Sequence, residues 1–320
     1  MTWLHRNWFL AGLVAAVGLA WLYPAAGAQG GFLRPDITIR AGVVLIFFSQ
    51  GLTLALATLR QGALRWRLHV VVQAWTFLLF PLVGLILDRV AGSRLPSDLR
   101  MGFLFLCVLP TTLSTAIVFT TLAGGNVAGA VFNATLSNLL GIVMTPLWTG
   151  WLLQTGGQPL PLGPVILQIV LLLLVPLAVG QVFRLWLRRW ADPRRVGLAR
   201  VNSGIVLFIV YAAFANSVQA RVWERYGWHS ALLAVTGVVL LFSVVMGAAY
   251  LTIRAARLDD ADSSAALFCA SQKTLAAGVP MAQLIFGAHP GLGLILLPVM
   301  LYHPLQLMVH GMIAVRWRRE

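Results

Sequence analysis

The chain has 320 residues, of which 59% are hydrophobic and only 10% are charged, and its formal net charge is +14. A soluble domain carries about 25% charged residues, so this composition excludes a soluble globular protein. The arginines lie at the ends of long apolar runs and not along a folded basic face, which also excludes nucleic acid as a partner.

Ten apolar runs follow one another along the chain, and each is long enough to cross a bilayer as a helix, which takes about 20 residues. Their hydrophobic residues are continuous and do not alternate in twos, so we interpret them as helices and not as barrel strands. The intervening loops are short, so residues 1–320 are predicted to form a single all-α transmembrane domain. The predicted spans cover approximately residues 7–24, 37–59, 66–88, 98–123, 126–153, 163–188, 199–220, 230–253, 260–286 and 291–315.

The arginines also predict an orientation. Placing the N-terminus in the cytoplasm puts 15 arginines inside and 7 outside, in the direction that the excess of basic residues in cytoplasmic loops requires. The even number of spans then predicts a cytoplasmic C-terminus, in the inner (plasma) membrane of a cell. One alternative stays open, because residues 1–29 also show the basic start, apolar run and small-residue motif of a secretory signal peptide.

An internal repeat accompanies these spans. The stretch LCVLPTTLSTAIV (106–118) matches FCASQKTLAAGVP (268–280) at Cys, Thr and Leu positions that lie 162 residues apart. This offset divides the chain into repeat one, 1–157, and repeat two, 158–320, with five spans each. Since five is odd, two successive copies must lie in the membrane with opposite orientation, which is the architecture of secondary transporters.

The fourth and ninth spans are both expected to break in the middle. The fourth is interrupted by Leu109-Pro110-Thr111-Thr112, because proline lacks the donor that continues a helix. The ninth is interrupted by the polar run Ser271-Gln272-Lys273-Thr274. Interrupted helices at matching positions of two inverted repeats point to a substrate and coupling-ion site near the membrane midplane.

Lys273 is the only lysine of the chain, and it lies at the most costly depth. It follows Asp262 by 11 residues, or ~16 Å of helix, in a hydrocarbon core ~30 Å thick. A charge there costs about 3 kcal/mol and usually marks a functional site. Two other interpretations stay open: a side chain that reaches back to the interface, and a structural lysine that donates to the loose carbonyls of the break.

The choice of lysine over arginine favours a functional role. Arginine stays charged, whereas a buried lysine can release its proton, so Lys273 could carry a proton through a transport cycle. None of the nine acidic residues lies in the middle third of a span, so no carboxylate is available to pair with it or to bind a bare sodium ion. An anionic substrate is therefore the expected partner of its three N–H donors.

Further polar residues at membrane depth complete the predicted substrate and coupling-ion site. Asn133 and Ser137 are four residues apart and share one helix face. Packing between helices is an alternative for each single serine or threonine. The sequence shows no metal-ligand spacing, no cofactor motif and no nucleophile motif, so no enzyme and no cofactor other than a coupling Na⁺ is expected. Besides Lys273, the candidates are Thr111, Thr112, Ser114, Thr115, Asn126, Asn133, Ser137, Asn138, Ser271, Gln272, Thr274 and His303, and Gln306 lies beside His303 in the middle of the same span.

Three motifs resemble those of the bile acid:sodium symporter superfamily. PTTLSTAIVFTTLAGGNVAGAVFNATLSNLLGIVMTP (110–146) is similar to its helix 4–5 signature, and FFSQGL (47–52) is similar to its helix 2 motif. FCASQKTLAAGVPMAQLIF (268–286) resembles the helix 9 signature of the branch that contains solute carrier family 10 member 7 and its bacterial relatives.

The resemblance implies ten helices in two inverted repeats, with helices 4 and 9 broken and crossing. It also implies a core (66–153 and 230–315) that moves against a panel (7–59 and 163–220). In the bile acid branch sodium is carried by helices 4, 5 and 9. Gln272 matches one of those positions, but the glutamate position is Phe268 here, the hydroxyl positions are Ala130 and Ala134, and the asparagine position is Lys273.

The sequence thus predicts a secondary active transporter that moves a small organic anion or polar solute by alternating access. The coupling cation is a proton carried by Lys273 or a sodium ion. Two alternatives stay open: a sodium-dependent symporter of bile acid-like or steroid-like anions, and a non-transporting membrane regulator of ion homeostasis. The expected partners are a small-molecule substrate and the lipid bilayer, and the oligomeric state is not specified by the sequence.

Overall fold

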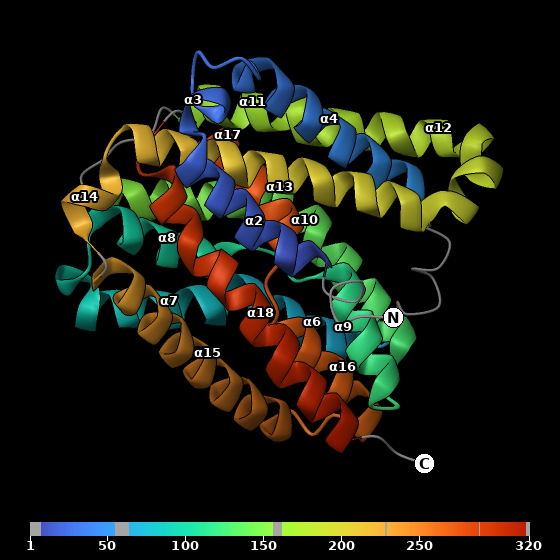
Figure 1. Cartoon of the computed structure of the whole chain (residues 1–320). Coiled ribbons are helices and arrows are strands. Elements are labelled where there is room, and N and C mark those ends of the chain that lie inside the picture. The colour runs from blue at the N-terminus through green and yellow to red at the C-terminus, as the bar shows by residue number, and fades with distance from the viewer. Residues whose placement is uncertain (1–7, 55–63, 156–161, 228, 288, 318–320) are drawn as a thin grey trace. The chain divides into compact units, whose positions relative to one another are not determined.

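The computed structural model describes residues 8–54, 64–155, 162–227, 229–287 and 289–317 (Figure 1). All regular structure in this part of the chain is helical, which confirms the all-α class. Six of the described helices are long and apolar enough to cross a membrane, or seven if one pair bent by 57° counts as a single span. Ten spans in two inverted repeats stay a prediction; the expected ends at residue 7 and at 55–59 lie outside the described residues.

The chain divides into two compact units, which we describe separately. Unit 1 comprises Met1–Leu54, Pro159–Trp228 and Val279–Leu296. Unit 2 comprises Ala55–Gln158, His229–Gly278 and Leu297–Glu320. Most residues of the candidate site, and both predicted breaks, belong to unit 2.

Unit 1 is built on two pairs of packed helices, α4 on α12 and α2 on α13. The close approach of α4 and α12 depends on glycine. A Cβ atom at Gly51 would overlap the carbonyl oxygen of Leu177, and one at Gly180 would overlap that of Phe48. Small residues let membrane helices approach at backbone distance. Its helices are α2 (Trp8–Leu22), α3 (Pro24–Gly27), α4 (Pro35–Thr53), α11 (Leu162–Ile169), η4 (Val170–Leu174), α12 (Val175–Ala191), η5 (Asp192–Arg194), α13 (Arg195–Gln219) and α14 (Val222–Tyr226).

Unit 2 is organised around α16, which packs against α6, α9, α10 and α15 (Figure 1). Asp259 caps the first turn of α16, since its carboxylate accepts the Asp262 N–H at 2.7 Å. Two helices, α17 and α18, run from one unit into the other. The helices are α6 (Trp66–Ala74), η2 (Trp75–Leu79), α7 (Phe80–Ala91), η3 (Gly92–Arg94), α8 (Ser97–Val108), α9 (Leu113–Leu122), α10 (Val127–Thr155), α15 (His229–Ala255), α16 (Asp260–Ser271), α17 (Leu275–Phe286) and α18 (Leu292–Arg316).

One wide turn in each unit precedes a proline. The π-helical segment η2 ends two residues before Pro81, and the π-helical segment η4 ends two residues before Pro176. Because proline has no N–H, the carbonyl that precedes it by one helical turn loses its hydrogen-bond donor. In a π turn the N–H groups bond five residues back and not four, so the carbonyl without a donor is the one five residues before the proline. Each of these segments therefore leaves a backbone carbonyl without its usual helical donor.

Both predicted breaks are present. Helix α8 ends at Val108 and α9 begins at Leu113, with a bend of 57° between them. Helix α16 ends at Ser271 and α17 begins at Leu275. The intervening residues, 109–112 and 272–274, have no helical hydrogen-bond pattern, as proline and the polar run indicated from the sequence.

The glycine contact between α4 and α12 gives a stability prediction. Replacing Gly180 with Ala should lower the free energy of unfolding by about 1–3 kcal/mol, because the new methyl group displaces the backbone of α4. Thermal unfolding of purified protein in detergent measures it. Gly204→Ala is the matched control, since Gly204 lies in α13 with nothing within 4 Å of an added Cβ. Equal unfolding temperatures for the two variants would contradict the prediction.

Candidate functional site

The two breaks lie against each other and are joined by three hydrogen bonds within unit 2. The N–H of Thr274 donates to the carbonyl of Pro110 at 3.0 Å, which links the two backbones directly. The Thr112 hydroxyl donates to the carbonyl of Lys273 at 3.1 Å. The Thr115 hydroxyl donates to Oε1 of Gln272 at 2.6 Å. The groups exposed by the break between α8 and α9 therefore serve as hydrogen-bond partners for the break between α16 and α17, and the reverse also holds.

Helix α10 satisfies much of the first break. The Thr145 hydroxyl donates to the carbonyl of Val108 at 2.8 Å, and Nδ2 of Asn138 donates to the carbonyl of Thr111 at 3.0 Å. The N–H of Thr111 donates to the hydroxyl of Ser137 at 3.1 Å. Hydroxyl and amide side chains thus replace the helical partners that the break removes, which is the condition for irregular backbone at membrane depth.

Helix α18 satisfies the second break through one stripe of side chains. Gln306 accepts from the N–H of Lys273 at 2.8 Å and donates to its carbonyl at 2.9 Å. The Tyr302 hydroxyl donates to the carbonyl of Ser271 at 2.7 Å, and His310 Nε2 lies 2.9 Å from the Ser271 hydroxyl. These three residues are four apart along α18, so they face the same direction.

The Lys273 ammonium is enclosed by backbone oxygens. The side chain is fully buried, and its Nζ donates to the carbonyls of Leu109 at 2.6 Å, Cys107 at 3.0 Å and Thr76 at 3.2 Å. It also lies 4.0 Å from the centre of the Phe80 ring, within the range of a cation–π interaction. An ammonium has three donors, and all three are used here. This is the geometry of the structural alternative, and it leaves none of the three N–H donors for an anion.

The carbonyl of Thr76 is available because of the π turn in η2. In a regular α-helix it would accept from the N–H of Phe80, but that N–H bonds to the carbonyl of Trp75. The next residue, Pro81, has no N–H to offer. A buried carbonyl without a donor is costly, and Lys273 fills the vacancy.

Two fully buried polar atoms beside the breaks have no protein partner among the described residues. They are the hydroxyl oxygen of Thr111 and Nε2 of Gln272. Buried polar atoms are rarely left unpaired, so a water or a bound solute is the natural partner of each. His303 lies one turn from this place on α18, with Nδ1 3.0 Å from Nε2 of Gln306. Ser114 is exposed in the first turn of α9.

Two predicted site residues lie in other contacts. Asn126 directly precedes α10 and donates to the Asp262 carboxylate at 2.6 Å, and Arg65 reaches the same carboxylate at 3.4 Å. Asn133 contacts Nδ1 of His69 at 3.0 Å and accepts from Gln73 at 3.2 Å. Asn133 and Ser137 share a face of α10 as predicted, but only Ser137 reaches the break.

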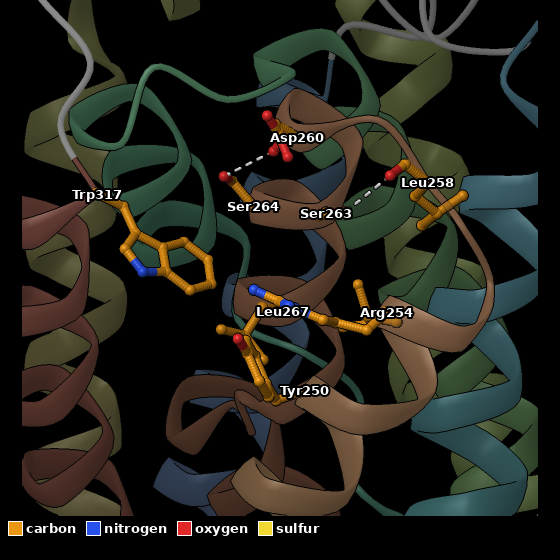
Figure 2. A pocket seen from close by; sticks show the side chains of 9 residues that line it. Tyr250, Arg254, Leu258, Asp260, Ser263, Ser264, Leu267 and Trp317 are labelled. Atoms are coloured by element: carbon orange, nitrogen blue, oxygen red, sulfur yellow. Dashed lines mark hydrogen bonds between the residues drawn. The ribbon is translucent and has the colours of Figure 1, made fainter.

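A pocket of about 390 Å³ lies at the start of α16, away from the predicted residues (Figure 2). Arg254 and Tyr250 of α15 form one wall, and Trp317 stands on the opposite side. The Ser264 hydroxyl donates to the carbonyl of Asp260 at 3.0 Å, so it is already paired. None of the residues predicted for the site lines this pocket.

Several residues of the site were not predicted from the sequence. They contribute carbonyls, hydroxyls and rings of residue types that are frequent in membrane helices, so the sequence does not single them out. Pro81 alone gives a local signal, because a proline after the π turn leaves a nearby carbonyl without its donor. Gln306, which was noted beside His303 from the sequence, is the residue of α18 that bonds to both backbone groups of Lys273. The missed residues are Thr76, Phe80, Thr145, Tyr302 and His310.

Helices long and apolar enough to cross a membrane, together with two helix breaks that bond to each other, are typical of a membrane transporter. Comparison with known proteins agrees with this class: the chain belongs to the SBF-like CPA transporter family, whose model matches residues 7–319. The resemblance found in the motifs is therefore confirmed, and the family identifies a transporter and not an enzyme.

Relatives cover nearly the whole chain. PA2026 of Pseudomonas aeruginosa is 39% identical, over 99% of this chain and 94% of its own. Sodium/bile acid cotransporter 7 of Danio rerio is 34% identical, over 96% of this chain and 92% of its own. Sodium/bile acid cotransporter 7 of Mus musculus is 30% identical, over 97% of this chain and 92% of its own.

The support that α10 gives to the first break can be tested with a valine pair. Thr145→Val keeps the shape of the side chain but leaves the buried carbonyl of Val108 unpaired, so the free energy of unfolding should fall by about 1–3 kcal/mol. Thr149→Val is the control, because the Thr149 hydroxyl bonds only within its own helix, to the carbonyl of Thr145. Thermal unfolding in detergent compares them, and a larger loss for Thr149→Val would refute the assignment.

Proposed function

We propose that the protein is a secondary active transporter that moves a small organic anion or polar solute by alternating access, coupled to a cation. The observation that carries the proposal is the pairing of two broken membrane helices, which bond to each other through Thr274, Thr112 and Thr115. Discontinuous helices of this kind form the substrate and ion sites of secondary transporters.

The proposed architecture is ten spans in two inverted repeats, 1–157 and 158–320, in the plasma (inner) membrane with both termini cytoplasmic. The repeat of the motif around Cys107 in that around Cys269 supports it, as does the matching position of the two breaks. The division into two compact units supports a core and a panel that move separately, with the difference that Val279–Leu296 groups with the panel helices. The terminal residues 1–7 and 318–320 lie outside the described part of the chain.

The solute is proposed to bind where the breaks meet. Helix α9 begins at Leu113 and α17 begins at Leu275, so two positive helix ends start beside the breaks. Nε2 of Gln272 offers an unused N–H donor there, and the Thr111 hydroxyl offers a second unpaired group. Lys273 adds a full positive charge close by. Donors and positive potential together suit a carboxylate, a sulfonate or a similar anion.

Coupling is proposed to use a proton on Lys273, with sodium as the second candidate. The sodium positions that the resemblance implies hold Phe268, Ala130 and Ala134, which are fully buried and carry no side-chain oxygen. Relatives named sodium/bile acid cotransporter 7 favour the second candidate, a sodium-dependent symporter of a bile acid-like or steroid-like anion. Neutral hydroxyls and backbone carbonyls at the breaks would then hold the ion.

A solute screen tests the proposal as a whole. Purified protein is heated with members of a library of small organic anions and polar solutes, because a ligand that binds the folded state raises its unfolding temperature. We expect anions to raise it, and the selected anion to be taken up by proteoliposomes. Uptake that depends on pH and is unchanged when potassium replaces sodium supports proton coupling. Uptake that requires sodium at every pH supports the second candidate, and no uptake of any stabilising solute opposes transport.

A glutamine pair tests the place of binding. Gln272→Leu should reduce uptake of the selected anion about 10-fold or more, because it removes the free N–H donor beside the breaks. Gln283→Leu is the control, since Gln283 makes only a weak bond at 3.4 Å to Gly287 in α17's last turn. Lys273→Met should abolish uptake while the protein still folds. Normal uptake by both Gln272→Leu and Lys273→Met would move the binding site elsewhere.

A further inference from the structure

We infer that the Lys273 ammonium is a tethered replacement for a bound monovalent cation, held in a cage of backbone carbonyls within unit 2. The cage is a cation site in its own right, and removing the lysine side chain should leave a site that takes a free ammonium or alkali ion. The inference deepens the proposed function. One consequence rests on that function: because the Lys273 side chain fills the cage, the transport cycle needs no free cation in the cage.

The cage is made of oxygens from three separate segments. They are the carbonyls of Thr76 in η2, Cys107 in the last turn of α8 and Leu109 in the first break, at 2.6–3.2 Å from Nζ. Rings of backbone carbonyls that converge on one point replace the hydration shell of a monovalent cation in selective membrane sites. The same convergence here surrounds an ammonium group.

Each segment has a reason to leave its oxygen open. The carbonyl of Thr76 loses its donor to the π turn and to Pro81. The carbonyl of Cys107 would face the N–H of Thr111, which bonds to Ser137 instead, and Pro110 offers no N–H. Leu109 lies beyond the end of α8. The open oxygens are therefore built into the backbone, and they exist independently of the lysine.

The surroundings favour positive charge without supplying a carboxylate. Two of the three oxygens lie at the C-terminal end of α8, which is the negative end of its dipole. The face of the Phe80 ring, 4.0 Å from Nζ, presents further negative potential. No salt bridge to Lys273 occurs among the described residues. A neutral group of the same length would leave three buried acceptors facing hydrocarbon.

Chemical rescue of Lys273→Ala tests the inference. Alanine retains Cβ, and propylammonium supplies the missing three carbons and the nitrogen. We expect propylammonium to raise the unfolding temperature of Lys273→Ala by about 3 °C or more in a saturable way, and ammonium or an alkali chloride to raise it less. The wild type, whose cage is filled, should not respond to any of these salts beyond the general effect of ionic strength.

Two controls separate charge from packing. 1-Propanol fills the same space without charge, and it should stabilise Lys273→Ala much less than propylammonium does. Lys273→Met fills the space covalently, and it should not respond to propylammonium. Equal stabilisation by propanol and propylammonium, or no response of Lys273→Ala to any cation, overturns the inference. If Lys273→Ala does not accumulate, expression with propylammonium in the medium should restore folded protein, and failure of this rescue where Lys273→Met accumulates counts against the cage.

This experiment is independent of transport. Rescue of stability by propylammonium without any solute uptake would support the cation cage and oppose the proposed function. Uptake by the wild type together with failed rescue would support transport and oppose the cage.

Discussion

An interrupted helix in hydrocarbon exposes backbone groups that no water can satisfy, and this constraint shapes unit 2. The two breaks meet it partly by bonding to each other, since Thr274 donates to Pro110 and Thr112 to Lys273. Neighbouring helices supply the rest: α10 through Thr145 and Asn138, and α18 through Gln306 and Tyr302. A packed shell of uncharged polar side chains therefore makes the irregular backbone possible.

Lys273 belongs to the same solution. A buried charge is costly when it has no partner, yet Lys273 removes the cost of three unpaired carbonyls at one point. The two penalties offset each other, which explains why a lysine is stable in a place with no carboxylate. The same arrangement keeps positive charge beside the starts of α9 and α17, where an anion would meet it without a direct hydrogen bond.

The sequence predicted the helical membrane class and the positions of both breaks, because proline and polar runs in apolar segments are local signals. For Lys273 it favoured an anionic substrate as the partner and gave the loose carbonyls of a break only as an alternative. The structure has the geometry of that alternative, but the carbonyl of Thr76 becomes available only through the π turn in η2, which the sequence did not predict. Asn126 and Asn133 were chosen for their depth alone, and their contacts with Asp262 and with His69 and Gln73 depend on how α6, α10 and α16 pack. Periodicity along one helix cannot supply that information.

The stripe on α18 has a consequence for how this helix can vary. Tyr302 and His310 bond to Ser271, and Gln306 bonds to Lys273, at the end of α16 and in the break that follows it. Their spacing of four residues must be kept for all three to bond. Inserting one residue between Tyr302 and Gln306 would rotate Gln306 and His310 by about 100° around the helix axis, and both would lose their bonds. The described side chains on the opposite surface of α18 make no bond to the second break. Relatives of this protein should therefore vary in side-chain size and shape on that opposite surface. They should keep the number of residues between Tyr302 and His310 unchanged.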